Sequence, residues 1–272
     1  MLLTIDIGNS SIVMGAFGDS DAPIACWRLE TDRHSSSETL RRSLHQFWQK
    51  SGLEANDFEG AALCSVVAPL TELWEGMLGE VLACEPLVLH HRMELGLTLE
   101  VRNPEQVGMD RLADAAAVRE RSTGAAVAVD FGTATTFNVV DEAGQFLGGA
   151  IAPGLVTAAE SLKASAPALA ELTEVFGALH SSSNEFESVP PFSAIGRDSD
   201  EALRSGIILG YVGLVEGLLA RIGHELDSPI TVIATGGIGH IITPLTGSID
   251  QYDPWLTLSG IRTVYLLNAG KR

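Results

Sequence analysis

A short apolar stretch that ends in an aspartate, an apolar residue and a glycine occurs twice along the chain. The first copy runs from Leu2 to Ile7 and continues as Gly8-Asn9-Ser10; the second runs from Ala126 to Phe131 and continues as Gly132-Thr133. Apolar runs closed by small polar residues are typical of strands that end in tight turns. The copies lie too far apart for a solenoid, so the pattern predicts two related domains.

Each copy is followed by further apolar strand, so we expect a β-hairpin at the start of each half. Helical periodicity appears only later in the first half, in two segments with one apolar strand between them. We expect strands at residues 12–17, 60–65, 137–140 and 145–151, a turn at 141–144, and helices at 37–51 and 69–81. This order predicts an α/β protein with mixed sheets flanked by helices.

The boundary between the halves is expected near a helix rich in alanine and leucine that runs from Asp110 to Arg121. We therefore predict an N-terminal domain of residues 1–114 and a C-terminal domain of residues 115–272. Residues 181–193 are rich in Ser, Pro, Asn and Glu without apolar periodicity, which is typical of a mobile surface loop.

Asp198 and Glu201 have the spacing of a capping box before a long helix that reaches about Leu226. Its most apolar part, residues 206–219, contains Glu216 and is shorter than a membrane span, so we interpret it as buried. Glycines recur on one side of this helix and suggest a close contact with another domain or a second copy of the chain. They are Gly206, Gly210, Gly213 and Gly217.

The formal net charge of −18 disfavours binding to nucleic acid, because a polyanion would be repelled. Cys26, Cys64 and Cys84 are odd in number and widely spaced, which argues against a disulfide framework or a zinc site. The adjacent His90 and His91 have no partner at ligand spacing. The N-terminus has no signal-peptide pattern, so we expect a cytoplasmic protein without a membrane segment.

The two strand-ending turns have the chemistry of a phosphate site. Glycines at positions 8 and 132 let the backbone N–H groups approach a phosphate chain closely. Asp6 is then the candidate to hold a hydrated Mg²⁺, with Asn9, Ser10 and Thr133 as neutral donors. One such turn alone is more often structural, but a third glycine-rich strand end, Thr235-Gly236-Gly237, favours a nucleotide site. P-loop and dinucleotide fingerprints are absent from the sequence.

Residues 103–111 form a second candidate site, in which Pro104 and Gly108 shape a loop before a helix. Asp110 at the helix start is either an ordinary cap or a general base that accepts a hydroxyl proton. Arg111 can bind a carboxylate or a phosphate. Asp114, one turn further on, is expected to be a solvated or interdomain acid.

Eight segments spread over nearly the whole chain carry a resemblance to one family. They are Asp6-Ile7-Gly8-Asn9-Ser10, Asn103-Pro104 with Val107-Gly108-Met109-Asp110-Arg111, Asp130-Phe131-Gly132-Thr133-Ala134-Thr135-Thr136, and residues 147–154, 195–197, 210–215, 234–237 and 253–258. In these segments the sequence resembles the type III pantothenate kinases. The resemblance implies two ribonuclease-H-like domains of the actin-like ATPase fold, a homodimer, and use of ATP, Mg²⁺ and a monovalent cation, K⁺ or NH₄⁺.

The resemblance also implies residue roles. Asp110 would be the catalytic proton acceptor, Asp130 would bind the monovalent cation, and Asp6 would hold Mg²⁺ through water. The implied ATP-binding residues are Asp6, Ile7, Gly8, Asn9, Ser10, Ser11, Ile12, Val13, Thr133, Gly236 and Gly237. The implied substrate-binding residues are Val101, Gly108, Met109, Asp110, Arg111 and Ser199.

Several positions depart from the family pattern. Val101 stands where a substrate-contacting Tyr is common, Asn138 where Asp is usual and Asp114 where Asn is usual; Asp198-Ser199 replaces Asn-Thr. The leading hypothesis is ATP-dependent phosphorylation of pantothenate to 4′-phosphopantothenate, which begins coenzyme A synthesis. The alternatives are a related kinase of another small hydroxy acid and a non-catalytic binding or regulatory protein.

Overall fold

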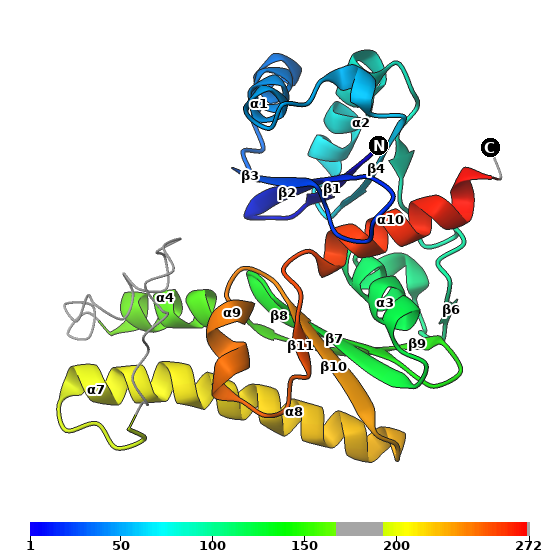
Figure 1. The fold of residues 1–272 in the computed structure, drawn as a ribbon. Helices are drawn as coiled ribbons and strands as arrows, with labels where there is room; N and C mark the ends of the chain where they lie inside the picture. The colour runs from blue at the N-terminus through cyan, green and yellow to red at the C-terminus, as the bar shows by residue number, and fades with distance from the viewer. Residues whose placement is uncertain (167–192, 271–272) are drawn as a thin grey trace. The chain divides into compact units, whose positions relative to one another are not determined.

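The structure is a computed structural model that describes residues 1–166 and 193–270 (Figure 1). The chain forms two compact units. Unit 1 contains residues 1–123, 140–148 and 255–272, and unit 2 contains residues 124–139 and 149–254. The predicted division between residues 114 and 115 rests on the repeated motif and stays a prediction.

Unit 1 is built on a five-stranded mixed sheet with the order β3-β2-β1-β4-β5. The hairpin of β1 and β2 is antiparallel, as predicted, whereas β1 and β4 run parallel. In that parallel pair Asp6 lies opposite Cys64. The strands are β1 (Leu2–Ile7), β2 (Ser11–Phe17), β3 (Ala25–Glu30), β4 (Gly60–Ser65) and β5 (Leu87–Val88).

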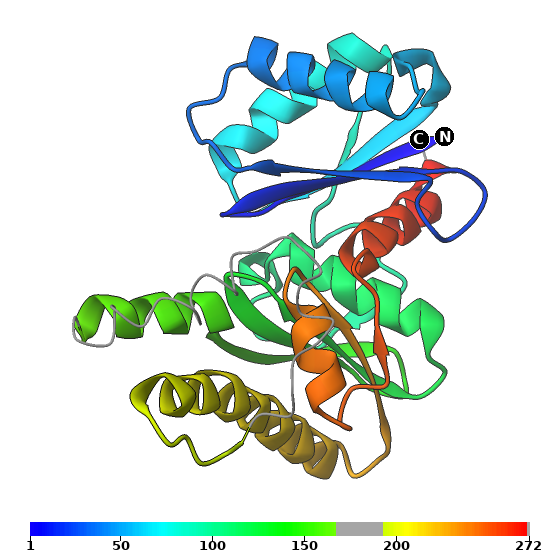
Figure 2. The same ribbon diagram turned by 60° about the vertical axis from the view of Figure 1, so that its left-hand side comes forward.

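Helices cover both faces of this sheet (Figure 2). α1 (Ser37–Lys50) and α2 (Ala68–Leu82) lie on one face, and α10 (Leu256–Ala269) lies on the other, beside α3 (Met109–Arg121). α1 begins at Ser36, whose side chain accepts a hydrogen bond from the Thr39 N–H. Its buried residues, Leu40, Leu44 and Trp48, recur every fourth position and pack into the core.

Short elements complete unit 1. They are the 3₁₀ turns η1 (Ala55–Asp57) and η2 (Pro104–Gln106), and the strand β6 (Thr98–Leu99), which pairs with the first two residues of β9.

The second sheet has the strand order β11-β10-β7-β8-β9-β6. Its strands are β7 (Ala125–Phe131), β8 (Ala134–Val140), β9 (Gln145–Pro153), β10 (Ile230–Thr235) and β11 (Gln251–Tyr252). The buried side chains of β7, β8 and β10 form one core cluster with those of α4 (Leu155–Ser165) and the long helix α8 (Gly210–Leu226). α9 (Gly239–Ile242) and the 3₁₀ turn η5 (Thr243–Leu245) follow β10.

The long helix predicted after Asp198 is confirmed, and it runs continuously from Ser199 to Leu226. It consists of α7 (Ser199–Arg204), a π-helical turn η4 (Ser205–Leu209) and α8. Asp198 caps it by accepting a hydrogen bond from the Glu201 N–H at 2.9 Å. The Glu201 carboxylate accepts from the Arg197 N–H, one residue before the position expected in a capping box.

The expectation that residues 206–219 of this helix are buried holds for one face only. The segment is the centre of a 28-residue helix, and α8 buries only one face, through Tyr211, Val212, Val215 and Leu219. By length and composition this helix could cross a membrane, a test that core helices also pass. Around Gly206, Gly210 and Gly213, no described residue outside the helix approaches the Cβ position within 4 Å, and the predicted contact of this face with another domain or a second copy stays a prediction.

The other predicted strands and helices are confirmed with boundaries that move by a few residues. The turn at 141–144 is closed by a hydrogen bond from the Gly144 N–H to the Asp141 carbonyl at 3.1 Å. The predicted mobile loop, apart from Ser193, lies outside the described residues. Several elements were not predicted, above all α4 and α10.

Candidate active site

The turn between β1 and β2 begins with Asp6 at the carboxyl end of β1. Across the parallel pair, the Cys64 Sγ donates a hydrogen bond to the Asp6 Oδ1 at 3.3 Å. The Gly8 N–H donates to the Ser11 carbonyl at 3.0 Å and closes the turn. The side chains of Ile7 and Ile12 are buried in the core, so any contact of these two residues with a phosphate would come from their backbone.

The end of β3 and the segment after it hold this turn from the other side. The Thr31 Oγ1 donates to the Gly8 carbonyl at 2.7 Å, and the Thr31 N–H donates to the Ser10 carbonyl at 3.1 Å. The Arg33 Nη2 donates to the Asn9 Oδ1 at 3.0 Å, and the Arg28 Nη1 donates to the Ser11 Oγ at 2.8 Å. Sequence reasoning missed these contacts because they join the turn to residues 17 to 24 positions away.

Asp110 lies in the first turn of α3, but it does not cap the helix. The N-cap is Gly108, and the Asp110 Oδ1 accepts a hydrogen bond from the next N–H, that of Arg111, at 2.8 Å. Burial raises the pKa of Asp110, although the Arg111 N–H and guanidinium oppose the rise. A carboxylate that is poorly solvated is a better proton acceptor than one in water.

Arg111 lies between two carboxylates and an aromatic ring. Its guanidinium carbon is 5.8 Å from the centre of the Phe146 ring. Burial lowers the pKa of Arg111, whereas the charges of Asp110 and Asp114 raise it. These contacts orient the guanidinium for a planar anion such as a carboxylate.

Asp114 is not solvated, so that part of its expected role is wrong. Its side chain is 1% exposed and its Oδ1 accepts a hydrogen bond from the Thr257 Oγ1 at 2.7 Å. The reason is that α10, which was not predicted, packs against α3 within unit 1 and excludes water from Asp114.

The structure brings Asp6 and Asp110, the two predicted site carboxylates of unit 1, close to Cys64. Burial raises the pKa of the Cys64 thiol well above its usual value, and the charges of Asp6, Asp110 and Asp114 raise it further. Residues 6 and 110 are far apart in sequence, yet both act on the same thiol at the end of β4. The signal was present in the predicted strand at 60–65, because parallel strands end at the same edge of a sheet.

A second group of predicted residues lies in unit 2. Asp130 is near the end of β7, opposite Thr235 of β10. Gly236 follows with a φ of 88°, and a Cβ at this position would be 2.5 Å from the Asp130 Oδ1 and 2.6 Å from the Phe131 backbone. The Thr133 carbonyl accepts hydrogen bonds from the Gly154 N–H and the Thr157 Oγ1. The backbone is therefore tightly packed around Asp130.

Two more predicted substrate residues lie one in each unit. Val101 is half-buried near Gly148 in unit 1, and Ser199 is exposed at the start of α7 in unit 2. Among the described residues there is no group of three or more His, Cys, Asp or Glu that could hold a metal by itself. An Mg²⁺ ion that arrives with ATP needs only one or two carboxylates, and the half-buried Asp6 fits that requirement.

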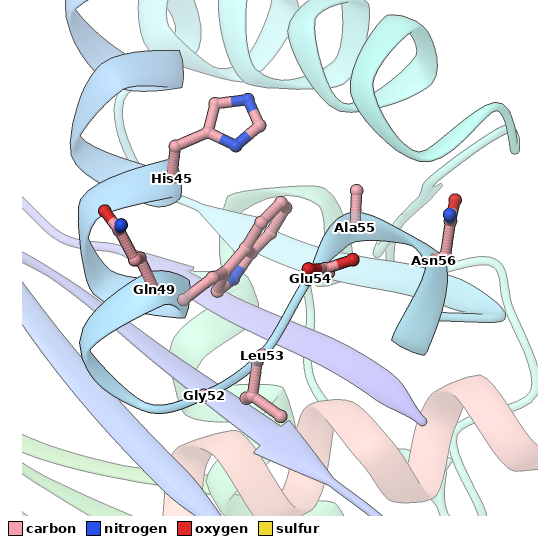
Figure 3. A pocket seen from close by; sticks show the side chains of 8 residues that line it. His45, Gln49, Gly52, Leu53, Glu54, Ala55 and Asn56 are labelled. Atoms are coloured by element: carbon pink, nitrogen blue, oxygen red, sulfur yellow. The ribbon is translucent and has the colours of Figure 1, made fainter.

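Two hollows lie elsewhere in the two units. One lies between the end of α1 and η1 and is lined by His45, Gln49, Glu54 and Asn56, among others (Figure 3). The other lies between α4 and the helix Ser199–Leu226 and is mostly apolar. None of the predicted site residues lines either hollow.

The fold is that of the actin-like ATPases. The activator of the 2-hydroxyisocaproyl-CoA dehydratase from Clostridium difficile, solved with bound ADPNP, superposes with a TM-score of 0.58 at 14% identity, covering 99% of this chain and 95% of that one. Component A of the (R)-2-hydroxyglutaryl-CoA dehydratase from Acidaminococcus fermentans superposes with a TM-score of 0.57 at 13% identity. The superposition covers 100% of this chain and 99% of that one. At these identities the likeness shows the fold alone.

The sequence places the chain within this class. The family model for type III pantothenate kinase matches residues 2–221. The type III pantothenate kinase of Moorella thermoacetica is 38% identical over 269 residues, which is 98% of this chain and 100% of the relative. That of a Roseiflexus species is 38% identical over 268 residues, which is 98% and 99%. The chain belongs to the type III pantothenate kinase family.

The environment of Cys64 predicts how the three thiols differ in reactivity. With a thiol reagent at about pH 8, we expect the half-buried Cys26 and Cys84 to react within minutes and Cys64 only after unfolding, because its thiolate is buried among carboxylates. Mass spectrometry of the labelled peptides measures this order. If Cys64 in the native protein is labelled as fast as Cys26, the Cys64 thiol is not buried among carboxylates as described.

The side chain of Asp110 folds back over Gly108. A methyl group at position 108 should therefore affect catalysis more than stability. A Cβ at Gly108 would be 2.3 Å from the Asp110 Oδ1, so Gly108→Ala should displace the carboxylate while the protein still folds. We expect kcat for pantothenate to fall by at least about tenfold with the melting temperature nearly unchanged. Gly76→Ala in α2 is the matched control, because nothing lies within 4 Å of its Cβ position. Equal activity of the two variants would show that the position of Asp110 is not critical.

The adjacent glycines after β10 predict opposite outcomes for the same substitution. Gly236→Ala forces a side chain into the left-handed region and against the Phe131 backbone, so we expect a loss of roughly 2–4 kcal/mol or failure to fold. Gly237→Ala meets nothing within 4 Å and should fold normally. Chemical denaturation of both variants tests this. Similar midpoints would mean that the backbone at Gly236 is not constrained.

Proposed function

We propose that this protein transfers the γ-phosphate of ATP to the 4′-hydroxyl of pantothenate, the reaction that begins coenzyme A synthesis. The family to which the chain belongs makes it a pantothenate kinase, a phosphotransferase with an alcohol as acceptor. The observation that carries the proposal is the half-buried Asp110 carboxylate at the start of α3, within a segment that matches the family pattern.

Asp110 is proposed as the general base. Its Oδ2 accepts the proton of the substrate hydroxyl as the oxygen bonds to the γ-phosphorus, and the bond to the β-phosphate oxygen breaks to release ADP. The raised pKa of Asp110 increases its basicity. The Arg111 N–H, bonded to the Oδ1, keeps the carboxylate oriented.

The turn at residues 6–13 is proposed to bind the phosphates of ATP. Gly8, Asn9, Ser10 and Ser11 offer backbone and side-chain donors in a tight turn. Asp6 would hold Mg²⁺ through water, and this ion would neutralise charge on the phosphates when bound. In unit 2, Asp130 is proposed to bind K⁺ or NH₄⁺. Thr133, Gly236 and Gly237 are proposed to contact ATP.

The pantothenate site is proposed to include the first turn of α3. Arg111 would bind the substrate carboxylate, since its guanidinium is oriented by Phe146 and by acidic neighbours. Val101, Gly108, Met109 and Ser199 would complete the substrate site.

We further propose a cytoplasmic homodimer of chains, each with actin-like domains at residues 1–114 and 115–272. The glycine-bearing face of the helix Ser199–Leu226 supports the dimer, because the described residues leave Gly206, Gly210 and Gly213 uncovered. With a net charge of −18 the surface is unsuited to nucleic acid, and no membrane partner is proposed.

The test is a coupled kinase assay with ATP, Mg²⁺ and pantothenate, with and without K⁺, comparing the intact chain with Asp110→Asn. We expect potassium-stimulated turnover that falls by about 10²- to 10⁴-fold in the variant, because the amide cannot accept the proton. Turnover with another small hydroxy acid but not pantothenate would favour a related kinase. Ligand binding without any phosphate transfer would favour a binding protein.

Thermal melting of the same variant separates chemistry from folding. The pKa of Asp110 is raised in the folded state, so its ionised form costs stability above the unfolded pKa, and Asn removes that cost. The melting temperature of Asp110→Asn should therefore equal or exceed that of the intact chain by a few degrees at pH 7. This difference should shrink as the pH falls towards the unfolded pKa of about 3.9 and vanish below about pH 3, where the carboxyl is protonated in both states. A large loss of melting temperature at pH 7 would contradict this account.

A further inference from the structure

The turn between β1 and β2 is contacted by two guanidinium groups that the phosphate hypothesis does not use. Arg33 reaches Asn9 in the middle of the turn, and Arg28 reaches Ser11 at its far side. Both side chains are exposed at the surface of unit 1. Each hydrogen bond uses one N–H of the guanidinium, which has five, so donors remain on both residues.

The chain has 35 acidic and 17 basic side chains, and two of its arginines contact the same turn. Elsewhere in unit 1, Arg41, Arg42 and Arg262 each pair with a carboxylate. Within the described part of the chain, neither Arg28 nor Arg33 has an ion-pair partner. The nearby acids do not pair with them, since the Asp32 Oδ1 accepts from the His34 N–H and Glu30 lies opposite Ser11 in the sheet without forming an ion pair.

The neutral turn alone offers only uncharged donors to a triphosphate. Asp6 at its start adds a negative charge, which opposes an anion. A guanidinium gives charge-assisted hydrogen bonds to phosphate oxygens that are about twice as strong as neutral ones. Two cations fixed at this turn therefore supply what the turn itself lacks.

We propose that Arg33, with Arg28 beside it, is a phosphate-binding residue that acts on the polyphosphate chain of the nucleotide through the donors its contact with Asn9 leaves available. The proposal rests on the proposed function, because that function places ATP at this turn. Arg28 contacts the end of the turn and is expected to contribute less than Arg33.

A purely structural role makes a different prediction. The hydrogen bond of Arg33 to Asn9 is exposed, and exposed contacts of this kind contribute little to stability. Loss of Arg33 should therefore leave the fold intact. If Arg33 only held the turn in shape, Arg33→Gln would weaken nucleotide binding to the same extent at low and at high salt, whereas the loss of a charged contact with phosphate matters less at high salt.

The experiment measures binding by the full-length protein, with a fluorescent ATP analogue displaced by ATP, ADP or adenosine in the presence of Mg²⁺. It compares Arg33→Gln, Arg33→Lys and the intact chain. Arg42→Gln is the matched control, because it removes the same charge from an exposed arginine of unit 1 that pairs with Glu38 instead of the turn.

We expect Arg33→Gln to weaken ATP and ADP binding by about tenfold, to leave adenosine binding unchanged and to raise KM for ATP more than it lowers kcat. Arg33→Lys should recover part of the loss, because a point charge remains without the forked geometry. Arg42→Gln should stay within about twofold of the intact chain. The effect of Arg33→Gln should shrink at high salt.

Equal effects of Arg33→Gln and Arg42→Gln, or an equal loss of adenosine and ATP binding, would overturn the proposal. Because the assay needs no acceptor substrate, the outcome is separable from that of the proposed function. Failure of the intact chain to phosphorylate pantothenate, with the phosphate-specific effect of Arg33→Gln intact, would reject the proposed function and support this inference.

Discussion

The parallel pairing of β1 with β4 places negative charge around a buried thiol, and the candidate site of unit 1 depends on this arrangement. Asp6 and Cys64 face each other in register, and the fields of Asp110 and Asp114 reach the same thiol. Carboxylates that gather in poorly solvated surroundings repel one another. Such an arrangement persists only where hydrogen bonds and nearby cations offset the cost, and here Arg111 and the Cys64 thiol contribute to that offset.

The start of α3 depends on α10, although α10 comes from the other end of the chain. Asp114 is buried beneath Thr257, one turn after the candidate base, and its charge acts on Arg111. The carboxylate of Asp110 and the guanidinium of Arg111 therefore have fixed surroundings on both sides. A base and an anion-binding residue held in this way lose little conformational entropy when a substrate binds.

The sequence predicted the parts of the fold that local periodicity determines. The hairpin at residues 2–17, the strand at 60–65 and the helix starting near Asp110 follow directly from apolar spacing and from turn residues. The positions of Asp6 and Asp110 as candidate acids came from the same reasoning. Whether they lie near one another could not be read from either segment, since that depends on the register of β1 and β4.

Other features were missed because they depend on contacts between distant segments. The burial of Asp114 needs α10, whose apolar pattern is weak and was not recognised. The helix Ser199–Leu226 is located as predicted, but its most apolar part, residues 206–219, is interpreted from composition as buried, whereas only one face of α8 packs into the core. Composition gives the total apolar content of a helix, but the packed neighbours decide how much of it is covered.

The contacts of Arg28 and Arg33 show how the overall charge and the local charge of a protein are separate constraints. A net charge of −18 repels a nucleotide, but salt screens the repulsion from charges that lie more than about 10 Å away. Within that distance, the groups at the turn itself decide whether a triphosphate is attracted. Because Asp6 is needed there for a metal ion and is itself negative, the cationic donors have to come from a neighbouring segment, and the end of β3 with the residues after it lies in contact with the turn.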